Sequence, residues 1–231
     1  MYSLSRLAFE KKVPLNADFF KTEVLPYITL FQGVEKFLHF IKDIEKTKEF
    51  NEVNLSIHHF IVSAGLQDLI SLVFAPELIT RVFGCRYTVI VHEGNETLPE
   101  SIPVFCMDET VKTRSLFEIS KGSFNDENKP VNKYLESKEL FAPFTNMIYI
   151  GDGDTDVPAL SLTRSKGGVG VALYNPAYSL EKRQERLKKM QANKRADLVT
   201  AADFSLDGQL FQYLKARCIQ IRQRYQAEAC V

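Results

Sequence analysis

The pattern of apolar and polar positions predicts helices and strands that alternate along most of the chain. Residues 33–50 place Val34, Phe37, Leu38, Ile41 and Ile44 on one helical face, with lysines and glutamates opposite. Short apolar runs rich in β-branched and aromatic residues predict strands at 58–65, 81–91, 146–150 and 167–174. Helical periodicity predicts helices at 66–74, 110–120, 157–165, 179–195 and 208–226, and residues 196–204 read as a short extended segment.

Strands that alternate with helices predict a three-layer, Rossmann-like α/β fold, in which a parallel sheet carries helices on both faces. Two stretches interrupt the pattern: residues 93–109 are predicted to be irregular, and residues 122–143 are polar and contain two prolines. In such folds ligands bind at the carboxyl ends of the strands. Chemistry-bearing residues that directly follow strands are therefore the candidates for a site.

Composition narrows the class of protein. The chain has 231 residues, which we treat as a single domain over 1–231, and its formal net charge is zero, so we expect no nucleic-acid partner. Residues 181–195 hold seven Lys or Arg against two Glu, which we interpret as a solvated helix face. We expect no membrane partner, because no apolar run approaches the roughly 18 residues that span a bilayer. Four widely spaced cysteines predict free thiols in a reducing cytoplasm.

The segment "MIYIGDGDTDVPAL", residues 147–160, places Asp152, Asp154 and Asp156 directly after an apolar run. Carboxylates so close together repel one another unless a cation lies among them. The spacing invites a calcium-loop interpretation, but Val157 and Thr163 stand where that loop needs Gly and Glu. A strand-end Mg²⁺ site fits better, because Mg²⁺ takes one or two carboxylates and leaves room for a phosphate. A solvated acidic turn is the alternative.

Two further positions suit a phosphate. Ser63, followed by Ala64 and Gly65, stands where a strand is predicted to end and a helix to begin, so a phosphate there would meet a hydroxyl and free backbone N–H groups. Taken alone, a serine at this place is also a common helix cap. Lys112, at the start of the helix 110–120, has the charge to neutralise a phosphate, although an isolated lysine is usually solvated.

Taken in order, "IVSAG", "TVKTRSLFEI" and "IYIGDGDTD" resemble motifs two, three and four of the haloacid dehalogenase-like hydrolase superfamily, closest to its phosphatase-like branch. The resemblance covers about residues 34–225. It implies that Ser63, with Ala64 and Gly65, binds the phosphoryl group. It also implies that Lys112 is the catalytic lysine that balances charge on phosphate and nucleophile, with Lys121 as a weaker substitute.

The same resemblance assigns roles to the aspartates. Asp152 matches the residue that ligates Mg²⁺, and Asp156 matches the acidic residue that supports the metal shell. Asp154 falls at a position where the family varies, so we do not expect it to be a ligand. The implied reaction is Mg²⁺-dependent hydrolysis of a small phosphorylated substrate, a phosphate monoester, through an aspartyl-phosphate. Residues 86–110 and 122–143 fall where the family carries insertions that cover the site.

The family's first motif, D-x-D-x-T or V, supplies the attacking aspartate and the general acid–base, and it is missing from this sequence. The nearest string is "DFFKT", in which Asp18 and Thr22 match but Phe20 replaces the second aspartate. We interpret residues 15–40 as helical segments and residues 1–33 as a helical remnant of a cap or linker.

The first motif also supplies the central strand of the family's sheet, between the strands of motifs two and four. Without it, those two strands must pair directly or leave a gap with unpaired backbone groups. We therefore expect a fold that lacks this strand, in a truncated gene product, a fragment or a pseudoenzyme with little or no phosphatase activity. The alternative is a non-catalytic binding or partner module that retains the fold. The sequence is silent on substrate identity and oligomeric state.

Overall fold

The computed structural model of the chain divides into two compact units. The structure describes residues 1–91, 99–125, 131–192 and 195–229, and of residues 191 and 192 it describes only the backbone. One unit comprises Met1–Leu30 and His59–Asp108, and the other Phe31–His58 and Glu109–Val231. The prediction that 1–231 form one domain stays a prediction, and parts of the predicted insertions 86–110 and 122–143 lie outside the described residues.

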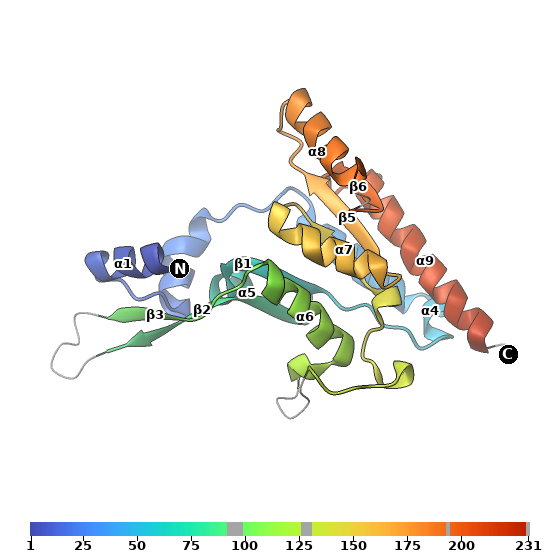
Figure 1. Ribbon diagram of the computed structural model, residues 1–231, viewed down its shortest axis with the longest axis horizontal. Helices are drawn as coiled ribbons and strands as arrows, with labels where there is room; N and C mark the ends of the chain where they lie inside the picture. The colour runs from blue at the N-terminus through green and yellow to red at the C-terminus, as the bar shows by residue number, and fades with distance from the viewer. Residues whose placement is uncertain (92–98, 126–130, 193–194, 230–231) are drawn as a thin grey trace. The chain divides into compact units, whose positions relative to one another are not determined.

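The first unit is built on a three-stranded sheet in the order β1–β2–β3, with β1 at Phe60–Leu66, β2 at Arg81–Ile90 and β3 at Glu100–Phe105 (Figure 1). Helix α5, Gln67–Val73, packs against β1 and β2. The N-terminal segment supplies α1 (Tyr2–Lys11), α2 (Ala17–Phe19), the π-helical turn η1 (Phe20–Val24) and the 3₁₀ turn η2 (Leu25–Tyr27). Ala8, Leu15 and Phe20 form its buried centre.

Strand β3 corrects the prediction that residues 93–109 are irregular. It pairs antiparallel with β2, so this sheet is mixed and not purely parallel. Pro103 lies within β3 and obscured the strand pattern in the sequence, because proline cannot donate to a ladder. Proline is tolerated here because β3 is an edge strand of the sheet that the described residues form.

The second unit is built on a parallel sheet in the order β4–β5–β6, with β4 at Ile148–Gly151, β5 at Val169–Tyr174 and β6 at Leu198–Ala201. Its α-helices are α3 (Val34–Asp43), α4 (Lys48–Asn51), α6 (Glu109–Lys121), α7 (Val157–Ser165), α8 (Leu180–Ala192) and α9 (Gln209–Ala229). Its 3₁₀ turns are η3 (Ile44–Lys46), η4 (Ser123–Asn125), η5 (Ser137–Glu139), η6 (Phe144–Asn146) and η7 (Asp154–Asp156).

Helices cover both faces of this second sheet, and Figure 1 shows α7 and α9 on either side of β5. Val169, Val171 and Leu173 of β5 pack with the buried side chains of α3 and α9. Gly170 faces the opposite side, where a Cβ atom in its place would lie 3.2 Å from Cδ2 of Leu160 of α7. The alternation of side chains along β5 thus separates two helical layers, and the predicted three-layer arrangement is confirmed within this unit.

The α/β class and the order of strands and helices are therefore confirmed, with corrections to the sheet. Strands β1 and β4, which carry the predicted second and fourth motifs, belong to separate sheets, and each is an edge strand of the sheet that the described residues form. No helix in the described part of the chain is long and apolar enough to cross a membrane. Cys85, Cys106 and Cys218 are free, as predicted, and Cys230 lies outside the described residues.

Candidate functional site

Helix α6 turns one lysine toward the interior of the second unit. The buried stripe of the helix contains Lys112, Ser115, Leu116 and Ile119, which recur at the spacing of a single helical face. Lys112 lies in this stripe, and only 6% of its side chain is exposed. A lysine is rarely buried without a partner. Its ammonium group donates to Oδ1 of Asp156 at 2.7 Å and to Oγ1 of Thr155 at 3.1 Å.

The carboxylate of Asp156 is the centre of this network. Besides the bond from Lys112, Oδ1 accepts a hydrogen bond from the hydroxyl of Tyr149 at 2.8 Å. Oδ2 accepts from the backbone N–H groups of Asp152 at 3.1 Å and Gly153 at 2.9 Å. Asp156 therefore holds together β4, the loop that follows it and α6.

Opposing effects act on the pKa of Asp156. Burial disfavours the charged carboxylate, but the hydrogen bonds from Lys112, Gly153 and Tyr149 outweigh it and hold the pKa below its ordinary value. Burial and the negative charge of Asp156 raise the pKa of Tyr149. Asp156 is therefore ionised and Tyr149 is a neutral donor at neutral pH.

The glycine at the end of β4 is required by this packing. A Cβ atom on Gly151 would lie 2.5 Å from Cβ of Asp156, closer than any two such atoms can approach. Tyr149 and Gly151 alternate onto the same face of β4, so the strand presents a hydroxyl and a flat backbone to one carboxylate. The first glycine of "GDGDTD" is thus explained by contact and not by a turn.

The three aspartates differ sharply in their surroundings. Asp156 is 5% exposed, whereas Asp152 and Asp154 are exposed. Within the part of the chain that the structure describes, the Asp152 side chain makes no hydrogen bond or ion pair. Asp154 pairs with Lys189 of α8 at 2.8 Å and lies 3.7 Å from Arg186. Asp152 is therefore the aspartate whose carboxylate can reach a ligand or a cation.

The predicted phosphate-binding segment lies in the other unit. Ser63, Ala64 and Gly65 fall inside β1, where four positions of β1 span two of β2, so they form a bulge in the strand. The Ser63 hydroxyl accepts a hydrogen bond from the N–H of Gly65 at 3.0 Å. The structure brings Lys112, Asp152 and Asp156 together within one unit and describes Ser63 in another, so its phosphate-binding role stays a prediction.

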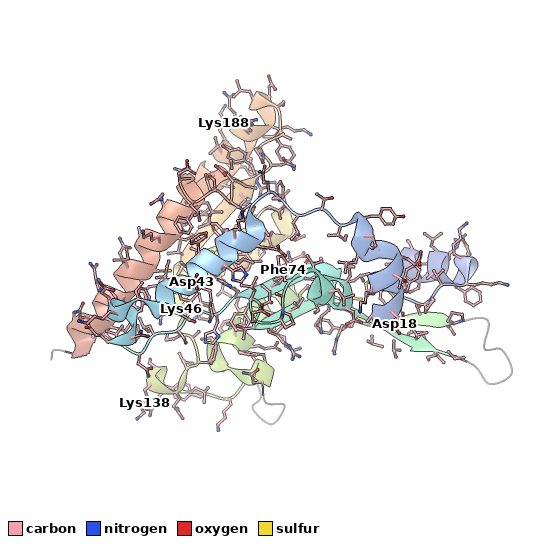
Figure 2. The ribbon with its side chains drawn as sticks, turned by 180° about the vertical axis from the view of Figure 1, so that it is seen from behind. Asp18, Asp43, Lys46, Phe74, Lys138 and Lys188 are labelled. Carbon is pink, nitrogen blue, oxygen red and sulfur yellow. The ribbon has the colours of Figure 1, made fainter. Side chains whose placement is uncertain are left out.

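Two weaker candidates, Asp18 and Lys121, take no part in this network. Asp18 lies on α2, exposed, and Asn16 caps the helix by accepting from the N–H of Phe19 (Figure 2). "DFFKT" is thus helical, and it does not follow a strand as a first motif would. Lys121 of α6 donates to the carbonyl oxygens of Val131 and Lys133, both at 2.6 Å, and so fastens the segment after the helix.

The sequence analysis missed the roles of several side chains in the second unit. Tyr149 was not a candidate, yet a tyrosine in an apolar strand beside an acidic loop signals a buried hydroxyl that needs an acceptor. Thr155 carried no signal, because its partner Lys112 lies 43 positions away. Arg186 and Lys189 were assigned to a solvated face, and only the fold shows that they reach Asp154.

The donor set limits how a metal can bind. Among the described residues no group of three or more His, Cys, Asp and Glu side chains is arranged to hold a metal ion. Both oxygens of Asp156 already accept two hydrogen bonds each, so this residue fits the role of orienting the loop better than that of a direct ligand. Asp152 fits as a single carboxylate ligand, which is enough for a Mg²⁺ ion that keeps its waters and binds a phosphate.

Comparison with known proteins adds one relative. No family model matches the chain. A stretch of 145 residues is 32% identical to a protein of Borreliella burgdorferi that is described as uncharacterized. The alignment covers 58% of this chain and 48% of that protein, so the chain spans about half the length of the curated relative it matches.

Proposed function

We propose that the chain binds a phosphate monoester together with Mg²⁺ at the carboxyl edge of β4, as the charge-balancing half of a haloacid dehalogenase-like phosphatase site. The sequence lacks the attacking aspartate of that family, so we propose binding without efficient hydrolysis by this chain. The fold class and the three motif resemblances support the family assignment. The alternative, a partner module that has kept only the fold, predicts no phosphate binding.

The observation that carries the proposal is the buried pair of Lys112 and Asp156 at the end of β4. A buried ion pair is a weak source of stability, because removing two charges from water offsets most of their attraction. We therefore interpret the pair as a contact that holds the ammonium group of Lys112 in place. Lys112 is the residue that the motif resemblance assigns to the phosphate, and Asp156, Tyr149 and Thr155 fix its surroundings.

Mg²⁺ would supply charge neutralisation for the phosphate oxygens. Of the three aspartates of the loop, Asp152 is the one whose carboxylate has no partner among the described residues, so Asp152 would hold the ion. We expect Mg²⁺ to bind weakly alone and more tightly with phosphate present. Asp156 accepts from the backbone N–H groups of Asp152 and Gly153 and so fixes the backbone of the loop that carries Asp152. These two different roles are consistent with the burial of Asp156 and the exposure of Asp152.

Calorimetric titration with inorganic phosphate, with and without Mg²⁺, tests the proposal. We expect Mg²⁺-dependent binding that Asp152→Asn abolishes, since this exposed side chain can be changed without loss of packing. Asp207→Asn, at an exposed aspartate elsewhere in the second unit, is the matched control and should bind as the unmodified chain does. Absence of phosphate binding, or binding unaffected by Asp152→Asn, would refute the proposal.

A second measurement separates binding from catalysis. The purified chain should release little or no p-nitrophenolate from p-nitrophenyl phosphate in the presence of Mg²⁺. Robust hydrolysis that is lost on Asp152→Asn would show that an attacking group is present after all, and it would overturn the assignment as a non-hydrolysing site.

A further inference from the structure

Helix α8 brings basic side chains to the carboxyl edge of the sheet in the second unit, next to the loop that follows β4. Arg186 donates from Nε to the carbonyl oxygen of Leu173, near the end of β5, at 3.1 Å. Its Nη1 lies 3.7 Å from Oδ1 of Asp154, and Lys189, three residues further along α8, donates to Oδ2 of Asp154 at 2.8 Å. The helix is also fastened by Met190, which is completely buried. These cations are therefore held beside the loop that carries Asp152.

Asp154 is a single carboxylate that faces two cations of α8. Lys189 lies 2.8 Å from Oδ2 and Arg186 lies 3.7 Å from Oδ1. One negative charge does not balance two positive ones, so these three residues together are net positive. An excess of positive charge at a sheet edge favours the binding of an anion.

The guanidinium of Arg186 points to the same conclusion. Its side chain is only 13% exposed, and among the described residues its Nη2 is buried without a hydrogen-bond partner. Buried polar atoms nearly always have a partner. An arginine that is fixed through Nε and lacks an acceptor at Nη2 is suited to bind a carboxylate or phosphate oxygen.

We propose that Arg186 and Lys189 form a second anion subsite, so that the ligand is a small molecule with a phosphate monoester and a second anionic group. Asp154 and Asp152 lie two residues apart, so their Cα atoms are separated by no more than about 8 Å. One small molecule can therefore reach both places. The inference rests on the proposed function for the first anion only; the second subsite depends on the residues around Asp154.

Matched ligands test the subsite: hexyl phosphate, hexanediol bisphosphate, and hexanoate with a terminal phosphate, each titrated in the presence of Mg²⁺. Their flexible chains can span the two places, and they differ only in the end group. We expect each of the two doubly anionic ligands to bind about tenfold tighter than hexyl phosphate or more, the effect of one charge-assisted hydrogen bond. The stronger of the two identifies the second group as phosphate or carboxylate.

Variants assign the effect to residues. The double variant Arg186→Gln, Lys189→Gln should abolish the preference of the doubly anionic ligands over hexyl phosphate. The control is Lys188→Gln, an exposed lysine on the same helix that is labelled in Figure 2, which should keep the preference. Circular dichroism confirms that each variant is folded.

The outcomes separate the two proposals. Equal binding of all three ligands, dependent on Asp152, would overturn the second subsite and leave the proposed function intact. Tighter binding of the doubly anionic ligands that depends on Arg186 and Lys189 but not on Asp152 would support the subsite and overturn the proposed function. Absence of binding by every ligand, or a preference that survives the double variant, would overturn the subsite.

Discussion

The buried pair of Lys112 and Asp156 allows a quantitative test of the site. Lys112→Met keeps the length and apolar character of the stem and removes the charge. It leaves a carboxylate whose side chain is 7% exposed, with three of its four hydrogen bonds remaining. Breaking a buried pair by removing one partner costs about 3–5 kcal/mol. Because three donors still stabilise the carboxylate, we expect the free energy of unfolding to fall by about 3 kcal/mol, the lower end of this range. Urea unfolding followed by circular dichroism measures it.

The loss should depend on pH in a defined direction. In the unmodified chain the pKa of Asp156 is lowered, so its contribution to stability is present above the unfolded pKa of about 3.9 and is lost as pH falls through the folded pKa. In Lys112→Met the burial effect is no longer balanced by the lysine, and the folded pKa rises. Protonation then relieves the buried charge. The difference in unfolding free energy between the unmodified chain and Lys112→Met should be largest at about pH 7 and shrink toward about pH 4.

An exposed ion pair on the same helix provides the control. Arg114 donates to Glu118 at 2.9 Å, and their side chains are 60% and 21% exposed. Arg114→Met should cost about 0–1 kcal/mol with little dependence on pH. Adding Asp156→Asn to Lys112→Met removes the unpaired charge and should recover about 1 kcal/mol or more at neutral pH. A loss in Lys112→Met that matches Arg114→Met, or that grows as the pH falls, would refute the reasoning.

Three further changes test the packing that supports the site and the first unit. Gly151→Ala places a Cβ 2.5 Å from Cβ of Asp156, so we expect a loss of about 1–3 kcal/mol in unfolding free energy by urea titration, and an unchanged midpoint would contradict the contact. Tyr149→Phe removes a buried donor to Asp156, and its cost should be about 1–3 kcal/mol, measured the same way and expected to vanish in an Asp156→Ala background, which has no acceptor. Ser101→Ala removes the buried hydroxyl that accepts from the N–H of Leu15 at 2.9 Å; we expect the exchange of this amide hydrogen to accelerate, and unaltered protection would show that the bond is absent in solution.

Local pattern predicted much of the chain because each element depends mainly on its own residues. Apolar periodicity correctly predicted strands β1, β2, β4 and β5 and the longer helices from α5 to α9. Strand β3 was missed because Pro103 interrupts it and its pairing with β2 is not local. The division into two sheets also lay beyond the sequence pattern, since strand order depends on which edges pair and not on the strands themselves.

The sequence by itself determined that an acidic, glycine-containing loop follows an apolar strand, and it predicted Lys112 for phosphate and Asp152 for a metal ion. Only the tertiary structure shows the surroundings that distinguish the three aspartates. Asp156 is turned inward because Gly151 leaves room for it and because a lysine 44 positions away and a tyrosine on β4 both donate to it. Asp154 instead meets α8. Hydrogen bonds between side chains so distant in the sequence are set by packing and register, which one-dimensional spacing does not contain.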